Sequence, residues 1–137
     1  MDEQMSFEVA VDAPHERTID RVTEALKAEG FGILTRIDVR ATLREKLGVE
    51  FRPYVILGVC NPPLAHRALV RSAEAGLLLP CNVTVEAAPD GRSIVRIGNP
   101  TVLLAVGGLD RDPTLLEVAR EAGKRLHRAA DALKQAS

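Results

Sequence analysis

The chain has 137 residues, 46% of them hydrophobic and 27% charged, which excludes a disordered chain and is typical of a domain with its own core. Its 18 lysines and arginines against 19 aspartates and glutamates give a net charge of −1, so no overall positive field attracts nucleic acid. We therefore expect a single domain over residues 1–137 and no nucleic-acid partner.

The first half of the sequence predicts two strands and two helices. Residues 5–11 alternate apolar and polar side chains, as a half-buried strand does. The segment Asp12-Ala13-Pro14 predicts a helix start capped by Asp12, and Gly30 predicts the end of that helix. Residues 32–39 favour a second strand, and residues 41–47 favour a short helix.

The middle of the chain predicts a buried strand followed by a long helix. Residues 52–60 form a nearly continuous apolar run with β-branched side chains, which is typical of a central strand covered on both faces. The segment Asn61-Pro62-Pro63 ends this strand. An apolar stripe that begins at Leu64 then predicts a helix that ends near Gly76.

The last part of the chain predicts a hairpin and a final helix. Residues 81–87 and 93–97 alternate on either side of a turn at Pro89-Asp90-Gly91, and residues 102–106 form a further apolar segment. A cap and a first-turn proline predict a C-terminal helix over residues 112–135. This order of elements favours a two-layer α+β domain, with helices packed on one face of a mostly antiparallel sheet.

Two segments each place a cysteine beside an asparagine and next to proline: Cys60-Asn61-Pro62-Pro63 and Pro80-Cys81-Asn82. The first segment ends a predicted strand and the second begins the strand after the intervening helix. A strand–helix–strand unit of this kind brings both thiols and both amides to one edge of the sheet, and His66 is placed to orient a ligand there. We expect a ligand site formed by Cys60, Asn61, Pro62, His66, Pro80, Cys81 and Asn82.

Three interpretations of the two thiols stay open. A thiol nucleophile or redox pair needs a lowered thiol pKa, which the helix predicted after Cys60 favours through its dipole. Two converging thiols also suit a two-coordinate soft cation, but zinc usually needs four ligands and the sequence has no CxxC or HxxxH pair, so we assign no metal site. Free cysteines are also among the most buried residues, so core packing explains them equally.

Other chemistries lack the residues they need. No serine lies in the Gly-flanked turn that exposes a catalytic serine, and Gly107-Gly108 lacks the further glycines and the lysine of a phosphate loop. The N-terminal residues are acidic rather than basic, and Pro80 interrupts the run Leu77-Leu78-Leu79. We therefore expect neither a signal peptide nor a membrane span, which makes the cytoplasm the expected compartment and excludes a membrane partner.

The segments Tyr54–Ala65 and Gly76–Val83, which contain the two Cys-Asn motifs, resemble the bacterial and archaeal family known as domain of unknown function 302. The similarity covers roughly residues 5–109. It implies a small α+β fold, a homodimer and signature residues in the Cys-Asn segments, and it assigns no activity. The family tends to carry Asp-Pro after the hairpin, whereas this sequence has Asn99-Pro100, so we expect no carboxylate function there.

Together, these residues favour a domain that binds or senses a small ligand in a Cys-Asn lined pocket. One alternative is a thiol enzyme or redox protein in which Cys60 attacks and Cys81 resolves. Another is a structural dimeric interaction module in which these segments only close the core. No motif assigns an enzymatic reaction or a cofactor.

Overall fold

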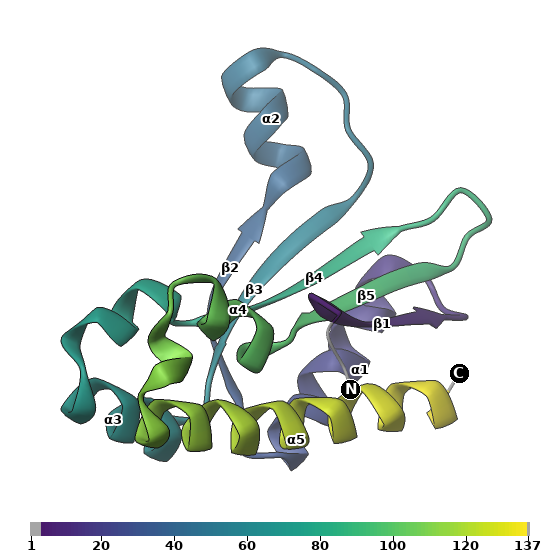
Figure 1. The fold of residues 1–137 in the computed structure, drawn as a ribbon. Coiled ribbons are helices and arrows are strands. Elements are labelled where there is room, and N and C mark those ends of the chain that lie inside the picture. The colour runs from purple at the N-terminus through teal and green to yellow at the C-terminus, as the bar shows by residue number, and fades with distance from the viewer. Residues whose placement is uncertain (1–3, 137) are drawn as a thin grey trace.

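The computed structural model describes residues 4–136, which form a five-stranded antiparallel sheet with helices packed on one face (Figure 1). This architecture confirms the two-layer α+β fold expected from the sequence. The order across the sheet is β1-β5-β4-β3-β2, and every neighbouring pair is antiparallel. The strands are β1 (Ser6–Val11), β2 (Gly32–Asp38), β3 (Tyr54–Cys60), β4 (Cys81–Ala87) and β5 (Ser93–Gly98).

The middle strand of the sheet is β4, and not the apolar run of β3 that the sequence analysis placed there. β3 is an interior strand between β4 and β2, but on its second face Tyr54 and Ile56 are only half-buried. Gly58 on that face is buried because Pro80 and Thr35 lie against it, and not because a helix covers it. The apolar run therefore reflects two different environments, one on each face.

The core lies between the sheet and the two long helices α1 (His15–Ala28) and α5 (Pro113–Ala136). Alternate strand residues point toward these helices because successive side chains in a strand point to opposite faces. Burying each such aliphatic side chain completely contributes roughly 1.5–3 kcal/mol. The strand residues in this layer include Val9, Val11, Val55, Leu57, Val59, Val83, Val85, Val95 and Ile97, and they face Val22, Leu26, Leu115, Leu126 and Leu133 of the helices.

The ends of α1 follow local rules that the sequence predicted only in part. Pro14 occupies the N-cap position and no side chain caps the helix, so the capping role expected for Asp12 is wrong. At the other end, the N–H of Gly30 donates to the carbonyl of Lys27 (3.0 Å) and the N–H of Phe31 to that of Leu26 (2.9 Å). This is a Schellman motif, and Gly30 supplies the positive φ of 87° that the motif requires.

Helix α2 (Val39–Leu47) stands away from the rest of the fold, at the far end of β2 and β3 (Figure 1). Asp38 caps its start by accepting a hydrogen bond from the N–H of Ala41 (2.9 Å), and Gly48, with φ of 68°, ends it. None of its residues is buried. Within residues 4–136 no helix is both long and apolar enough to cross a membrane.

Four shorter helical segments complete the described chain. The helix expected from Leu64 to near Gly76 divides at Ser72, where the backbone is extended (φ −153°, ψ 122°). The apolar residues 102–106 lie in a helix that the sequence analysis did not assign. The segments are α3 (Pro62–Arg71), the 3₁₀ helix η1 (Ala73–Leu78), α4 (Pro100–Val106) and the 3₁₀ helix η2 (Leu109–Arg111).

The geometry at Gly30 predicts a loss of stability on substitution. We expect Gly30→Ala to lower the free energy of unfolding by about 1–3 kcal/mol, because a Cβ would strain the positive φ and lie 2.9 Å from Nδ2 of Asn61. Gly48→Ala imposes the φ strain in open space and should cost less. Gly107→Ala, with a negative φ and no atom within 4 Å, is the control. Urea unfolding measures all three, and equal losses at Gly30 and Gly107 would contradict the expectation.

Candidate ligand-binding site

Two helices begin at the same end of the sheet, and an Asn-Pro pair starts each of them. Asn61 follows β3 and accepts a hydrogen bond from the N–H of Leu64 (3.2 Å), which caps α3. Asn99 follows β5 and accepts hydrogen bonds from the N–H (3.3 Å) and Oγ1 (2.9 Å) of Thr101, which caps α4. Since β3 and β5 flank β4 and both run antiparallel to it, both end where β4 begins at Cys81.

A pocket of about 580 Å³ lies at this end of the sheet, between α3, η1, α4 and α5. This volume is in the range of pockets that hold small molecules. Its walls are mainly leucine, alanine and valine, and none of the charged side chains or histidines in the described chain lines it. The polar side chains on the wall are the amides of Asn61 and Asn82, beside the thiols of Cys60 and Cys81.

The structure brings together five of the seven residues expected to form the site. Both thiols, both amides and Pro80 line the pocket. Pro62 is in the first turn of α3 and His66 is exposed, and neither lines it. His66 instead borders a shallower pocket of about 350 Å³, with Arg67, Val70, Arg71 and Thr114.

The two cysteines are neighbours across the β3–β4 pair. Cys81 lies directly opposite Val59, the residue before Cys60, and both thiols are half-buried. Burial, together with the smaller effect of the nearby Cys60 thiol, raises the pKa of the Cys81 thiol to about 11. Cys81 is therefore a protonated thiol at neutral pH, which weakens its expected role in a thiol enzyme that depends on a thiolate.

Gly58 lets Pro80 lie on β3. A Cβ at Gly58 would be 2.3 Å from Oγ1 of Thr35 and 2.9 Å from Cγ of Pro80, closer than real Cβ contacts come. The proline ring thus occupies the space that a side chain on β3 would take, and it fixes the chain directly before Cys81. The glycine in the apolar run of β3 is the sequence signal for this close approach.

The sequence analysis missed the exposed apolar side chains that border the pocket. Leu77 of η1 is 83% exposed, Val106 of α4 is 84% exposed and Met5 is 67% exposed, and all three line the pocket. Large apolar side chains at the surface are informative when they gather at one site. The signal in the sequence is the run of three leucines before Pro80, which the sequence analysis used only in excluding a membrane span.

Asn99 has a structural role that explains why this chain has Asn-Pro where the family tends to carry Asp-Pro. Its Nδ2 donates a hydrogen bond to the carbonyl of Gln4 (3.1 Å), while its Oδ1 caps α4. An ionised aspartate has acceptors but no donor and could not make the contact to Gln4. The amide therefore ties the chain before β1 to the start of the helix that bounds the pocket.

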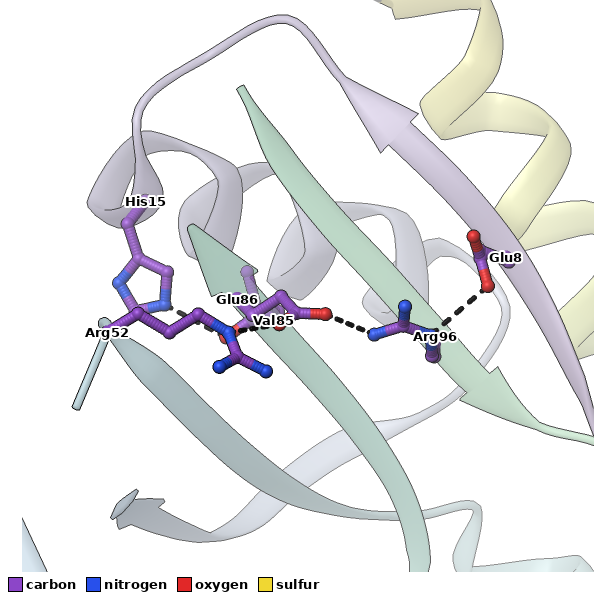
Figure 2. Close-up of polar contacts among 6 residues, drawn as sticks. All are labelled: Glu8, His15, Arg52, Val85, Glu86 and Arg96. Carbon is purple, nitrogen blue, oxygen red and sulfur yellow. Dashed lines mark hydrogen bonds and ion pairs between the residues drawn. The ribbon is translucent and has the colours of Figure 1, made fainter. Parts of the chain in front are cut away.

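A second polar cluster lies on the sheet face opposite α1 and α5 (Figure 2). Glu86 is 7% exposed; one carboxylate oxygen accepts from Nε of Arg52 (2.5 Å) and the other from Nη1 of Arg96. Nε of Arg96 also donates to Glu8 (3.1 Å). The hydrogen bonds from the two arginines outweigh the effect of burial and lower the pKa of Glu86. Since both guanidinium groups already have carboxylate partners, we interpret this cluster as structural.

The fold and the pocket define a small α+β domain with an apolar cavity at the end of an antiparallel sheet. A family model described as "Domain of unknown function DUF302" matches residues 7–133, and the chain belongs to this family. The match includes the C-terminal helix, beyond the residues that carried the resemblance. The chain is also similar to a crystal structure of the uncharacterized conserved protein DUF302 from Bacillus stearothermophilus. The two share 37% sequence identity over 94% of this chain and 98% of that one, with a TM-score of 0.83. No curated protein matches.

The raised pKa of Cys81 predicts slow alkylation. In the Cys60→Ser variant, where Cys81 is the only thiol, we expect iodoacetamide at pH 8 to react at least about tenfold more slowly than with the same chain unfolded in urea. The rate should still increase between pH 9 and pH 10, because the thiolate is scarce below pH 11. A rate that reaches its plateau below pH 8 would contradict this assignment.

The lowered pKa of Glu86 predicts a pH-dependent contribution to stability. The carboxylate stabilises the fold above its ordinary pKa of 4.5, and this contribution is lost as the pH falls through the lower pKa of the folded state. We expect Glu86→Gln to lower the free energy of unfolding by about 1–3 kcal/mol at pH 7, a difference that shrinks below about pH 4. Glu117→Gln, which removes an exposed ion pair with Arg67, is the control and should change stability by less than about 1 kcal/mol. An equal loss in both variants would refute a special role for Glu86.

Proposed function

We propose that this domain binds a small, uncharged and mainly apolar molecule in the pocket at the end of the sheet. The observation that carries the proposal is the pocket itself: about 580 Å³, with apolar walls and the two Cys-Asn segments on one side. The amides of Asn61 and Asn82 offer hydrogen-bond partners, so the ligand would carry one or a few polar groups beside its apolar body.

The pocket walls favour an apolar ligand over the small polar ligand that the paired amides first suggest. A charged group in the pocket would lose its hydration, and no lining side chain between residues 4 and 136 carries a compensating charge. Phosphates, nucleotides and carboxylate substrates are therefore poor candidates. The exposed apolar side chains at the border, Leu77 and Val106 among them, extend the apolar surface outward.

Several residues of the pocket wall are buried or hydrogen-bonded, which supports a pocket that is already formed before a ligand binds. Asn61 is only 5% exposed and its side-chain oxygen is used in capping α3, which holds one wall in place. Leu104 of α4 and Ala119 of α5 are buried and line another wall. Binding would then require little rearrangement of these elements, which favours affinity.

A neutral apolar dye, Nile red, tests the proposal. We expect one dye molecule to bind per chain with an increase in fluorescence. Ala65→Phe, which fills the pocket from α3, should weaken binding at least about tenfold because it removes both the space and the apolar contact area. Ala132→Phe places the same ring on an exposed position of α5 that does not line the pocket, and it is the matched control.

Thermal unfolding of both variants checks that they are folded. Dye binding that is equally strong in Ala65→Phe and in the control would place the dye elsewhere and would count against the pocket. Native mass spectrometry of the purified wild-type chain can then look for a co-purified neutral molecule, which Ala65→Phe should no longer retain.

A further inference from the structure

Four charged side chains form a row across the open face of the sheet, which is the face opposite α1 and α5 (Figure 2). Arg52 lies just before β3, Glu86 in β4, Arg96 in β5 and Glu8 in β1, so the row passes from each strand to its neighbour. Each charged group is hydrogen-bonded to the next one in the row. The charges therefore alternate in sign along the row: positive, negative, positive, negative.

The two ends of the row keep hydrogen-bonding atoms for further partners. Arg52 binds Glu86 through Nε, and this bond does not use its two terminal nitrogens. At the other end, Glu8 binds Arg96 through Oε1, and this bond does not use Oε2. Both ends are accessible, because the Arg52 side chain is 49% exposed and the Glu8 side chain 58%. Charges that approach from solvent can therefore form ion pairs with the row.

Apolar side chains lie beside the row on the same face. Tyr54 of β3 and Ile94 of β5 are both directly opposite Glu86 of β4, and both are half-buried. Ile56 is half-buried and lies opposite Ile37 of β2, which is 48% exposed. Directly opposite residues, and residues two apart in a strand, share one face of the sheet. This face therefore combines a charged row with apolar side chains that further packing can bury.

We infer that the open face of the sheet binds the same face of a second copy of this chain, with the two charged rows running in opposite directions. In such a dimer the two-fold axis lies between the two sheets, at right angles to the row, and passes between Glu86 and Arg96. Arg52 then faces Glu8 of the partner subunit, and Glu86 faces Arg96 of the partner subunit. Every positive group meets a negative group, and the same patch serves both copies, as two-fold symmetry requires.

The alternating order of the charges favours a second copy over other partners. Nucleic acid and anionic membranes present charge of one sign, so half of the row would repel them. A row of alternating sign is complementary to its own reverse, and a second copy supplies that reverse. The ion pairs set the orientation, while burial of side chains such as Tyr54 and Ile56 supplies most of the binding free energy. None of the four charged residues lines the pocket, so the inference is independent of the proposed ligand.

Sedimentation equilibrium of the wild-type chain tests the inference directly. We expect a species of twice the chain mass, with a dissociation constant that rises at least about tenfold between about 0.1 M and 1 M NaCl, because salt screens the ion pairs. Glu8→Lys faces Arg52 of the partner subunit with a like charge, and Arg52→Glu does the same toward Glu8 of the partner subunit. Each variant should weaken the dimer at least about a hundredfold, since the repulsion occurs twice.

A mixture of the two variants separates contacts between copies from effects within one chain. In a dimer with one copy of each variant, the substituted residues face each other with opposite charges, and so do the two unchanged residues. We expect this mixed dimer to form within about tenfold of the wild-type affinity, and native mass spectrometry identifies it because the two variants differ in mass. Loss of an ion pair within one chain would not be repaired by mixing.

The matched control is Glu117→Lys, which reverses an exposed charge on α5, away from the open face. It should leave the dissociation constant within about threefold of wild type. Thermal unfolding checks that all three variants are folded.

Four results would overturn the inference. They are a wild-type chain that stays monomeric up to about 1 mM, a wild-type dimer that salt does not weaken, a dimer that neither variant weakens, and a mixture that associates no better than the separate variants. The first two are measured on the wild-type chain, so they decide the question even if a variant does not fold.

Discussion

The directions of the strands set where the helices, the pocket and the two cysteines lie. Because β4 pairs antiparallel with both β3 and β5, its first residue lies at the end of the sheet where those two strands finish. Asn61 and Asn99 then turn the chain into α3 and α4 at that same end. The pocket is the space between these helices, η1 and α5. The position of the pocket follows from the strand pairing and from the two helix caps. Cys60 and Cys81 border the pocket because each lies at the end of a strand.

Burial raises the pKa of both Glu86 and Cys81, but the net shifts of these two groups have opposite directions. Glu86 is buried between two guanidinium groups, and their hydrogen bonds hold its pKa below the ordinary value despite the loss of hydration. Cys81 is half-buried against the core and has no positive charge beside it, so burial dominates and its pKa rises. The open face of the sheet therefore holds charged side chains, whereas in the pocket burial keeps the Cys81 thiol protonated at neutral pH.

The composition of the pocket wall bears on which molecules this domain could bind. Two Asn-Pro helix starts bound a pocket whose described walls are apolar apart from two amides and two thiols, and this composition supports the proposed binding of an uncharged molecule. Among residues 4–136, no charged side chain lines this pocket. Asn99, which stands where the family tends to have aspartate, has a structural role, because its side chain donates a hydrogen bond to the carbonyl of Gln4.

The sequence predicted the strands and the long helices, since these depend on local periodicity and on helix-end residues such as Asp112 and Gly30. It also paired the two Cys-Asn segments, because a strand–helix–strand unit returns the chain to a neighbouring strand. It did not assign α4, because a short apolar run has no distinct period, and it placed β3 in the centre although β4 holds that position. The sequence could not show that His66 lies outside the pocket or that Leu77 and Val106 border it. Those positions depend on how α3, η1, α4 and α5 pack against one another, which no local pattern encodes.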